Sequence, residues 1–179
     1  MPEENTQLKE KADFLLDVLK RYDHYVATTN FKVGLMMSFL GAIVLGLTIR
    51  VLLLDPVQGE IGCIRYTTII AISLTVASAL YAAIQLLRAA FPNTKNDNGA
   101  DSLIFFGAVV TENKNPEEYY QKVLSIEQGE ILRDLSTQTY NMAGVVNHKF
   151  KVLKIAVNTM IFVTIPLLAV SLALLIVEG

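Results

Sequence analysis

The chain has 179 residues, of which 53% are hydrophobic and 18% are charged, and its mean hydropathy is +0.44. The apolar excess over an ordinary soluble domain indicates a membrane protein. The net charge of −2 argues against a nucleic-acid polymer as partner, and one cysteine excludes an intrachain disulfide or a cysteine-based zinc site. We therefore expect an all-α membrane protein that needs no cofactor.

Residues 1–32 are predicted to form an N-terminal helix with heptad spacing. Apolar side chains recur at alternating steps of four and three residues, at Leu8, Ala12, Leu15, Leu19, Tyr22 and Val26. This spacing places them on one face of a helix. Since no Gly or Pro separates this helix from the apolar residues that follow, we expect it to continue into the bilayer.

Three segments are predicted to span the membrane, at residues 33–54, 66–91 and 155–177. A bilayer requires roughly 20 apolar residues per helix, and the second and third segments contain uncharged runs of this length, over Tyr66–Leu87 and Ile155–Val177. The first segment meets it if Arg50 extends its guanidinium to the interface along its apolar stem. Residues 55–65 are expected to form the short loop between the first two spans.

Residues 92–154 are predicted to form a second, largely helical segment outside the membrane. Phe91-Pro92-Asn93 ends the preceding helix, and a polar loop over Asn93–Asp101 follows. Asn115-Pro116-Glu117-Glu118 is typical of a helix start, because Asn caps, Pro fits the first turn and the acids face the positive dipole end. We expect a turn near Gly129 and a continuous helix from Glu130 through the third span, where Pro166 predicts a kink.

The helix after Gly129 carries an apolar face with two polar interruptions. The apolar positions are Ile131, Leu135, Met142, Val145 and Val152, and the interruptions are Gln138 and Lys149. We expect this helix and the N-terminal helix to pack in parallel and to form a helical layer that continues into the first and third spans.

The distribution of basic residues predicts the orientation in the membrane. Of the 15 Lys and Arg residues, five precede the first span, and eight lie from Arg88 at the end of the second span to Lys154 before the third, which leaves only Arg50 and Arg65 beside the loop at residues 55–65. By the positive-inside rule, the N-terminus and residues 92–154 are cytoplasmic and the C-terminus lies outside. Residues 55–65, and with them Cys63, then belong to the outer side.

Small residues at a spacing of four line one face in each of two spans. The first face contains Gly34, Ser38, Ala42 and Gly46, and the second contains Ala71, Thr75, Ala79 and Ala83. Such faces let helices approach closely in lipid. They fit either packing within one chain or assembly of several copies into a homo-oligomer.

Basic residues gather at the inner boundary, at Lys32, Lys149, Lys151 and Lys154. One interpretation is that they anchor the spans and meet anionic lipid. The alternative is an anion site between the two long helices, with Lys32, Arg133, Gln138 and Lys149 as candidate ligand-binding residues. No Gly-rich phosphate loop, HExxH, GxSxG or CxxC motif occurs, and we expect no enzymatic activity.

Several short motifs point to a known family. Asn30-Phe31-Lys32 keeps the lysine of an Asp-x-Lys pattern, Leu103–Gly107 contains Phe-Phe-Gly, and Pro116–Tyr119 reads Pro-Glu-Glu-Tyr. Asp134, Leu135, Gln138, Tyr140 and Lys149 fit an Asp-Leu-x-x-Gln-x-Tyr helix that ends in lysine before the last span. With these motifs the chain resembles the Pycsar system effectors, a family of bacterial membrane proteins, although Asn30 replaces the acid.

The resemblance implies a role in anti-phage signalling by cyclic pyrimidine nucleotides. It implies an inner-membrane effector that a cyclic nucleotide triggers to multimerise and breach the bilayer, with cyclic UMP and cyclic CMP as candidate ligands. The competing interpretation is a non-enzymatic scaffold or sensor that docks a cytoplasmic partner through the N-terminal heptads. A small transporter is disfavoured, because no Asp, Glu, Lys or His lies in the middle of a span.

Overall fold

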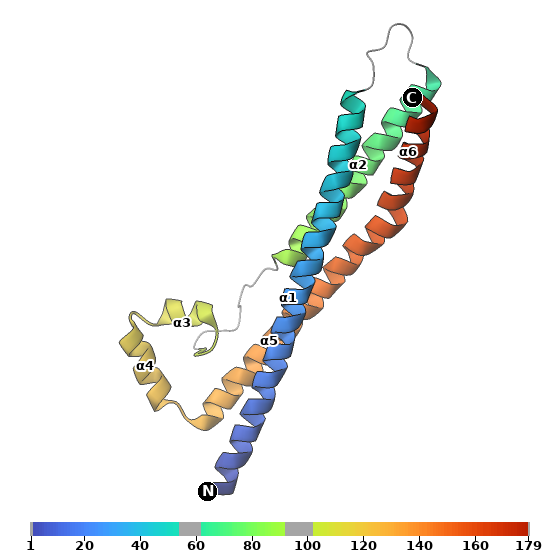
Figure 1. Cartoon of the computed structure of the whole chain (residues 1–179). Coiled ribbons are helices and arrows are strands. Elements are labelled where there is room, and N and C mark those ends of the chain that lie inside the picture. The colour runs from blue at the N-terminus through green and yellow to red at the C-terminus, as the bar shows by residue number, and fades with distance from the viewer. Residues whose placement is uncertain (1, 54–61, 92–101, 179) are drawn as a thin grey trace. The chain divides into compact units, whose positions relative to one another are not determined.

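The computed structural model describes residues 2–53, 62–91 and 102–178, with side chains from residue 6 onward. In these ranges the chain is helical apart from short connections, and no strand is present. The elements are α1 (Pro2–Leu52), α2 (Cys63–Ala90), α3 (Phe106–Glu112), α4 (Pro116–Ser125), α5 (Gln128–Thr159), the π-helical η1 (Met160–Thr164) and α6 (Ile165–Glu178) (Figure 1). The predicted all-α fold is confirmed, with three helices long and apolar enough to span a membrane.

The chain divides into two compact units, which we describe separately. The extension unit comprises Met1–Ala27 and Asn93–Asn147, and the membrane unit comprises Thr28–Pro92 and His148–Gly179. Both α1 and α5 contribute residues to each unit. The loops expected at residues 55–65 and 93–101 lie almost entirely outside the described residues, apart from the start of α2.

The membrane unit contains three packed helices: α1, α2 and the continuous run α5–η1–α6. The first and the third are parallel to each other, and α2 is antiparallel to both. One core cluster joins Val33 and Leu40 of α1 to the alanine-rich end of α2 and to Val152–Met160. A second joins Ile43 and Leu47 to Ile72 and Leu175. From the first cluster to the second, residue numbers rise in the first and third helices and fall in α2. The three helices therefore have an up-down-up topology.

Close packing in this unit depends on the small residues of α2. Ala79, Ala82 and Ala89 are buried, and Leu86 between them is fully enclosed. Small side chains bring helix backbones together, and in lipid such van der Waals packing is a main source of helix association.

The third span leaves α-helical geometry just before Pro166. The Ile165 N–H donates to the Met160 carbonyl five residues earlier, which is the π-helical pattern. Pro166 has no N–H, and its ring would clash with the carbonyl four residues earlier. A wider turn at η1 relieves that conflict, so the irregularity predicted from Pro166 takes the form of a π segment.

In the extension unit, the start of α4 has the predicted cap. Asn115 Oδ1 accepts from the Glu118 N–H at 2.8 Å, and Glu118 Oε2 accepts from the Lys114 N–H at 2.9 Å. The first contact satisfies a backbone donor that the first helical turn leaves unpaired, and the second fastens the residue before the cap to the same turn. The following turn lies at Ile126 and Glu127, and Gly129 belongs to the first turn of α5.

Side chains on the predicted heptad face of α1 are less exposed than their neighbours. Leu8, Leu15 and Leu19 are half-buried, whereas Lys9 and Asp13 are exposed. This burial pattern follows the spacing of four and three along the helix.

Candidate functional site

A buried lysine connects three helices in the membrane unit. Lys149, on α5, is only 2% exposed. Its Nζ donates to Asn30 Oδ1 on α1 at 2.9 Å and to the carbonyls of Ala89 and Ala90 on α2 at 2.8 and 3.0 Å. A single ammonium group therefore ties α5 to both other helices.

The chemistry of Lys149 matches its surroundings. An ammonium has three N–H donors and needs three acceptors when it is buried, since an unpaired buried charge is costly. Ala89 and Ala90 are the last residues of α2, where carbonyls have no partner in their own helix and the dipole is negative. Lys149 thus caps the C-terminal end of α2.

The other predicted ligand-binding residues do not take part in the hydrogen bonds of Lys149. Lys32 is exposed on α1 in the membrane unit, whereas Arg133 and Gln138 belong to the extension unit. The sequence predicts Lys149 as part of an anion site, whereas in the structure its ammonium group donates to Asn30 Oδ1 and to two carbonyls of α2. The role of these four residues in ligand binding stays a prediction.

A second polar cluster lies in the extension unit around Asp134 of α5. Asp134 Oδ2 accepts from the Leu103 N–H at 2.9 Å and from the Ser102 hydroxyl at 3.2 Å. Gln138 Nε2 donates to Ser102 Oγ at 3.0 Å, and Ser102 Oγ also accepts from the N–H groups of Ile104 and Phe105. The turn that precedes α3 is thereby attached to α5.

Tyr119 of α4 joins the same cluster. Its hydroxyl donates to the Leu103 carbonyl at 2.9 Å. Three motifs from separate parts of the chain therefore meet in one hydrogen-bond network. They are Leu103–Gly107, Pro116–Tyr119 and the helix that contains Asp134 and Gln138. Sequence reasoning missed Ser102, because a single serine before an apolar segment carries no pattern.

The two small-residue faces have different surroundings. On α2, Ala71, Thr75 and Ala79 are buried inside the chain and Ala83 is half-buried. On α1 the whole face is exposed, at Gly34, Ser38, Ala42 and Gly46. A Cβ added at either glycine would meet no atom within 4 Å. The α2 face thus serves packing within the chain, and the α1 face is available at the surface.

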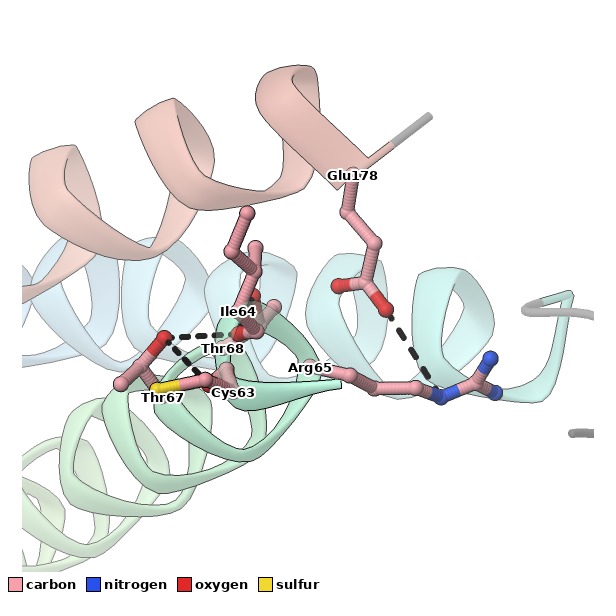
Figure 2. A network of polar contacts seen from close by, with 6 residues as sticks. All are labelled: Cys63, Ile64, Arg65, Thr67, Thr68 and Glu178. Carbon is pink, nitrogen blue, oxygen red and sulfur yellow. Dashed lines mark hydrogen bonds and ion pairs between the residues drawn. The ribbon is translucent and has the colours of Figure 1, made fainter. Parts of the chain in front are cut away.

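The opposite end of the membrane unit holds an ion pair (Figure 2). Arg65 Nε lies 3.7 Å from Glu178 Oε1, which connects the start of α2 to the end of α6. Nearby, the Thr68 hydroxyl donates to the Ile64 carbonyl at 2.9 Å. Cys63 is exposed at the first residue of α2. Within the described ranges, no three His, Cys, Asp or Glu residues are grouped so that they could hold a metal ion.

Three apolar helices in an up-down-up bundle, with polar clusters at the ends of the spans, define a multi-pass α-helical membrane protein. The chain belongs to the Pycsar effector family, whose protein domain (PycTM) matches residues 14–177. The Pycsar effector protein EcPycTM of Escherichia coli is 24% identical over 155 residues, which cover 84% of this chain and 83% of the relative. No solved structure matches the chain. The family is named for an effector and not for a catalytic activity.

Proposed function

We propose that this chain is the membrane effector of a bacterial anti-phage system, triggered by a cyclic nucleotide to assemble and to disrupt the inner membrane. The observation that carries the proposal is the family match over residues 14–177, which reaches all three span helices and the extension unit. Such an effector acts on the bilayer itself, so the lipid membrane is its target.

Two continuous helices support transmission of a signal to the spans. Both α1 and α5 pass from the extension unit into the membrane unit without a break in the helix. A ligand shifts an equilibrium between two packings only by its differential affinity for them. A nucleotide that prefers one packing of the extension unit would therefore bias the arrangement of the spans.

For the nucleotide itself we propose contacts with the basic and amide side chains predicted from the sequence. Arg133 and Lys32 are exposed, and their side chains can form charge-assisted hydrogen bonds to a phosphate. Gln138 donates to Ser102, so a ligand that competes for this amide would weaken the attachment of α3. A phosphate at Lys149 would have to replace one of three existing acceptors.

The exposed face of α1 supports assembly. Gly34, Ser38, Ala42 and Gly46 offer a surface on which a helix from a second copy can approach closely. We further propose the orientation given by the basic residues, with the N-terminus and the extension unit in the cytoplasm and the C-terminus outside.

Release of a trapped dye tests the proposal. Purified protein is placed in vesicles of phosphatidylethanolamine and phosphatidylglycerol that contain a self-quenching dye, and cyclic UMP or cyclic CMP is added. We expect one nucleotide to bind, by calorimetry, and to cause release. Arg133→Ala or Lys32→Ala should weaken binding, whereas Lys9→Ala, which removes another exposed charge from α1, should not.

Two outcomes would contradict the proposal. The absence of binding heat with both nucleotides, together with killing of cells that contain no cyclase, would remove the nucleotide. Insertion into vesicles without release by either nucleotide would favour the alternative, a scaffold that docks a cytoplasmic partner through the heptad face of α1.

A further inference from the structure

A line of polar side chains runs along the buried face of α2. Thr68, Thr75, Ser78 and Gln85 are separated by steps of seven and three residues, which places them on one face of the helix. Thr68 and Thr75 are fully buried, Gln85 is 7% exposed, and Ser78 is half-buried. The outward side of the same helix is mostly apolar, with Ile70, Leu74 and Ile84 among its exposed residues, and is suited to lipid.

The third span presents hydroxyl groups to this line. Thr164 of η1 and Ser171 of α6 are seven residues apart, and both are fully buried. The Thr75 and Ser171 hydroxyl oxygens lie 2.9 Å apart, and the Ser78 hydroxyl donates to Thr164 Oγ1 at 3.2 Å. We call these four side chains, with Thr68, the hydroxyl seam.

Each hydroxyl of the two pairs also has an acceptor in its own helix. Thr75 reaches the Ala71 carbonyl at 2.8 Å, and Ser171 reaches the Leu167 carbonyl at 2.9 Å. Ser78 reaches the Thr75 carbonyl at 2.8 Å, and Thr164 reaches the Thr159 carbonyl at 3.4 Å. Separation of α2 from α6 would therefore leave no hydroxyl hydrogen unpaired, so the seam can open without the usual cost of stranding polar groups in lipid.

The third span also has a place at which it can move. At η1 the regular α-helical hydrogen bonds are interrupted, and Pro166 follows without an N–H of its own. Helices bend at such sites because fewer backbone hydrogen bonds oppose the motion. Ser171 lies beyond this point on α6, so bending at η1 would withdraw it from Thr75.

We propose that the hydroxyl seam between α2 and the third span lines the path along which water and small ions cross the bilayer in the active effector. The inference rests on the proposed membrane-disrupting function and assigns that function a route. In the resting chain the hydroxyls pair across the two helices, Thr75 with Ser171 and Ser78 with Thr164, and exclude water. In the active state they face water, while the apolar outer surfaces stay in lipid.

Cysteine accessibility tests this assignment. In a Cys63→Ser background, Ser171→Cys and Thr164→Cys place thiols on the seam, and Leu172→Cys and Val163→Cys place them on neighbouring exposed positions of the same helices. The proteins are placed in dye-loaded vesicles, treated with cyclic UMP or cyclic CMP, and exposed to a charged, membrane-impermeant thiosulfonate. Because hydrocarbon excludes charged groups, we expect the nucleotide to accelerate modification of the seam cysteines about tenfold or more, without accelerating it at the control positions.

Modification should also block the release of the dye, since the added group occupies the path.

A second experiment removes hydroxyl groups from the seam. The double variant Thr75→Val, Ser171→Ala should release dye more slowly, whereas Ser73→Ala, on the exposed side of α2, should leave the rate of dye release unchanged. Two results would overturn the proposed path and leave the proposed function standing. One is dye release while the seam cysteines stay unmodified, and the other is an unchanged rate of dye release in the Thr75→Val, Ser171→Ala variant. If the unsubstituted protein releases no dye with either nucleotide, the proposed function fails and the seam fails with it.

Discussion

Lys149 Nζ lies 2.9 Å from Asn30 Oδ1, and this contact joins side chains 119 positions apart in the chain. Lys149 is buried and has little contact with water, whereas Asn30 is exposed to water. The lysine that ends the helix motif and the asparagine of the Asn30-Phe31-Lys32 motif are therefore direct partners. Asn30 therefore gives Lys149 a neutral acceptor on α1.

Asn30→Asp should stabilise the membrane unit. Lys149 is a cation, so a carboxylate at position 30 would add an ion pair to the existing hydrogen bond, and an exposed carboxylate loses little hydration. We expect a higher midpoint of thermal unfolding in detergent, and a lower midpoint for Asn30→Ala. A midpoint that falls with Asn30→Asp would show that the 2.9 Å contact does not govern stability at this position.

Lys149→Met should destabilise the protein by about 3 kcal/mol, because it leaves the buried Ala89 carbonyl and the partly buried Ala90 carbonyl at the end of α2 without this donor. The matched control is Lys151→Met, which removes an exposed charge two residues away and should change stability by less than about 0.5 kcal/mol. Unfolding by denaturant measures both. Loss of nucleotide binding with unchanged stability would instead support the phosphate role for Lys149.

Asp134→Ala should free the turn that precedes α3. The Asp134 carboxylate accepts from the Leu103 N–H and the Ser102 hydroxyl, and both contacts disappear with the substitution. We expect faster hydrogen exchange at the amides of Leu103, Ile104 and Phe105, measured by mass spectrometry. Arg133→Ala, at the exposed neighbouring position, should leave these amides protected. Equal exchange in both variants would show that other contacts hold the turn.

Gly46→Leu should shift the protein to smaller oligomers in detergent. A Cβ added at Gly46, on the exposed face of α1, meets no atom of its own chain within 4 Å, so we expect the effect to fall on a second copy. Leucine also has a higher helix propensity than glycine, and the chain should stay folded. Ala79→Leu is the contrasting variant, because Ala79 is 1% exposed and a larger side chain there should disturb the fold itself. Light scattering that gives an unchanged mass for Gly46→Leu would assign the α1 face to lipid.

The orientation can be read from thiol labelling in intact cells. In a Cys63→Ser background, a cysteine added after Gly179 should react with an impermeant reagent, and Asn98→Cys should react only after lysis. The reverse pattern would place the extension unit outside and would exclude cytoplasmic activation.

Local patterns in the sequence determined the elements of this protein. The uncharged stretches specify three span helices, because a bilayer demands a minimum apolar length whatever the rest of the fold. Asn115 and the acids after Pro116 specify the start of α4, since a cap satisfies donors within one turn of itself. The polar interruptions at Gln138 and Lys149 were visible for the same reason: they break a helical period.

Only the tertiary structure decided which groups these polar residues meet. The partners of Lys149 include two backbone carbonyls, at Ala89 and Ala90, and a carbonyl leaves no mark on the side-chain pattern. The partner of Gln138 is Ser102, 36 residues away, and the register between the segments sets that contact. The two small-residue faces have the same spacing, yet only the α2 face is covered. Periodicity tells which residues share a face, and the packing of neighbouring helices decides which face is buried.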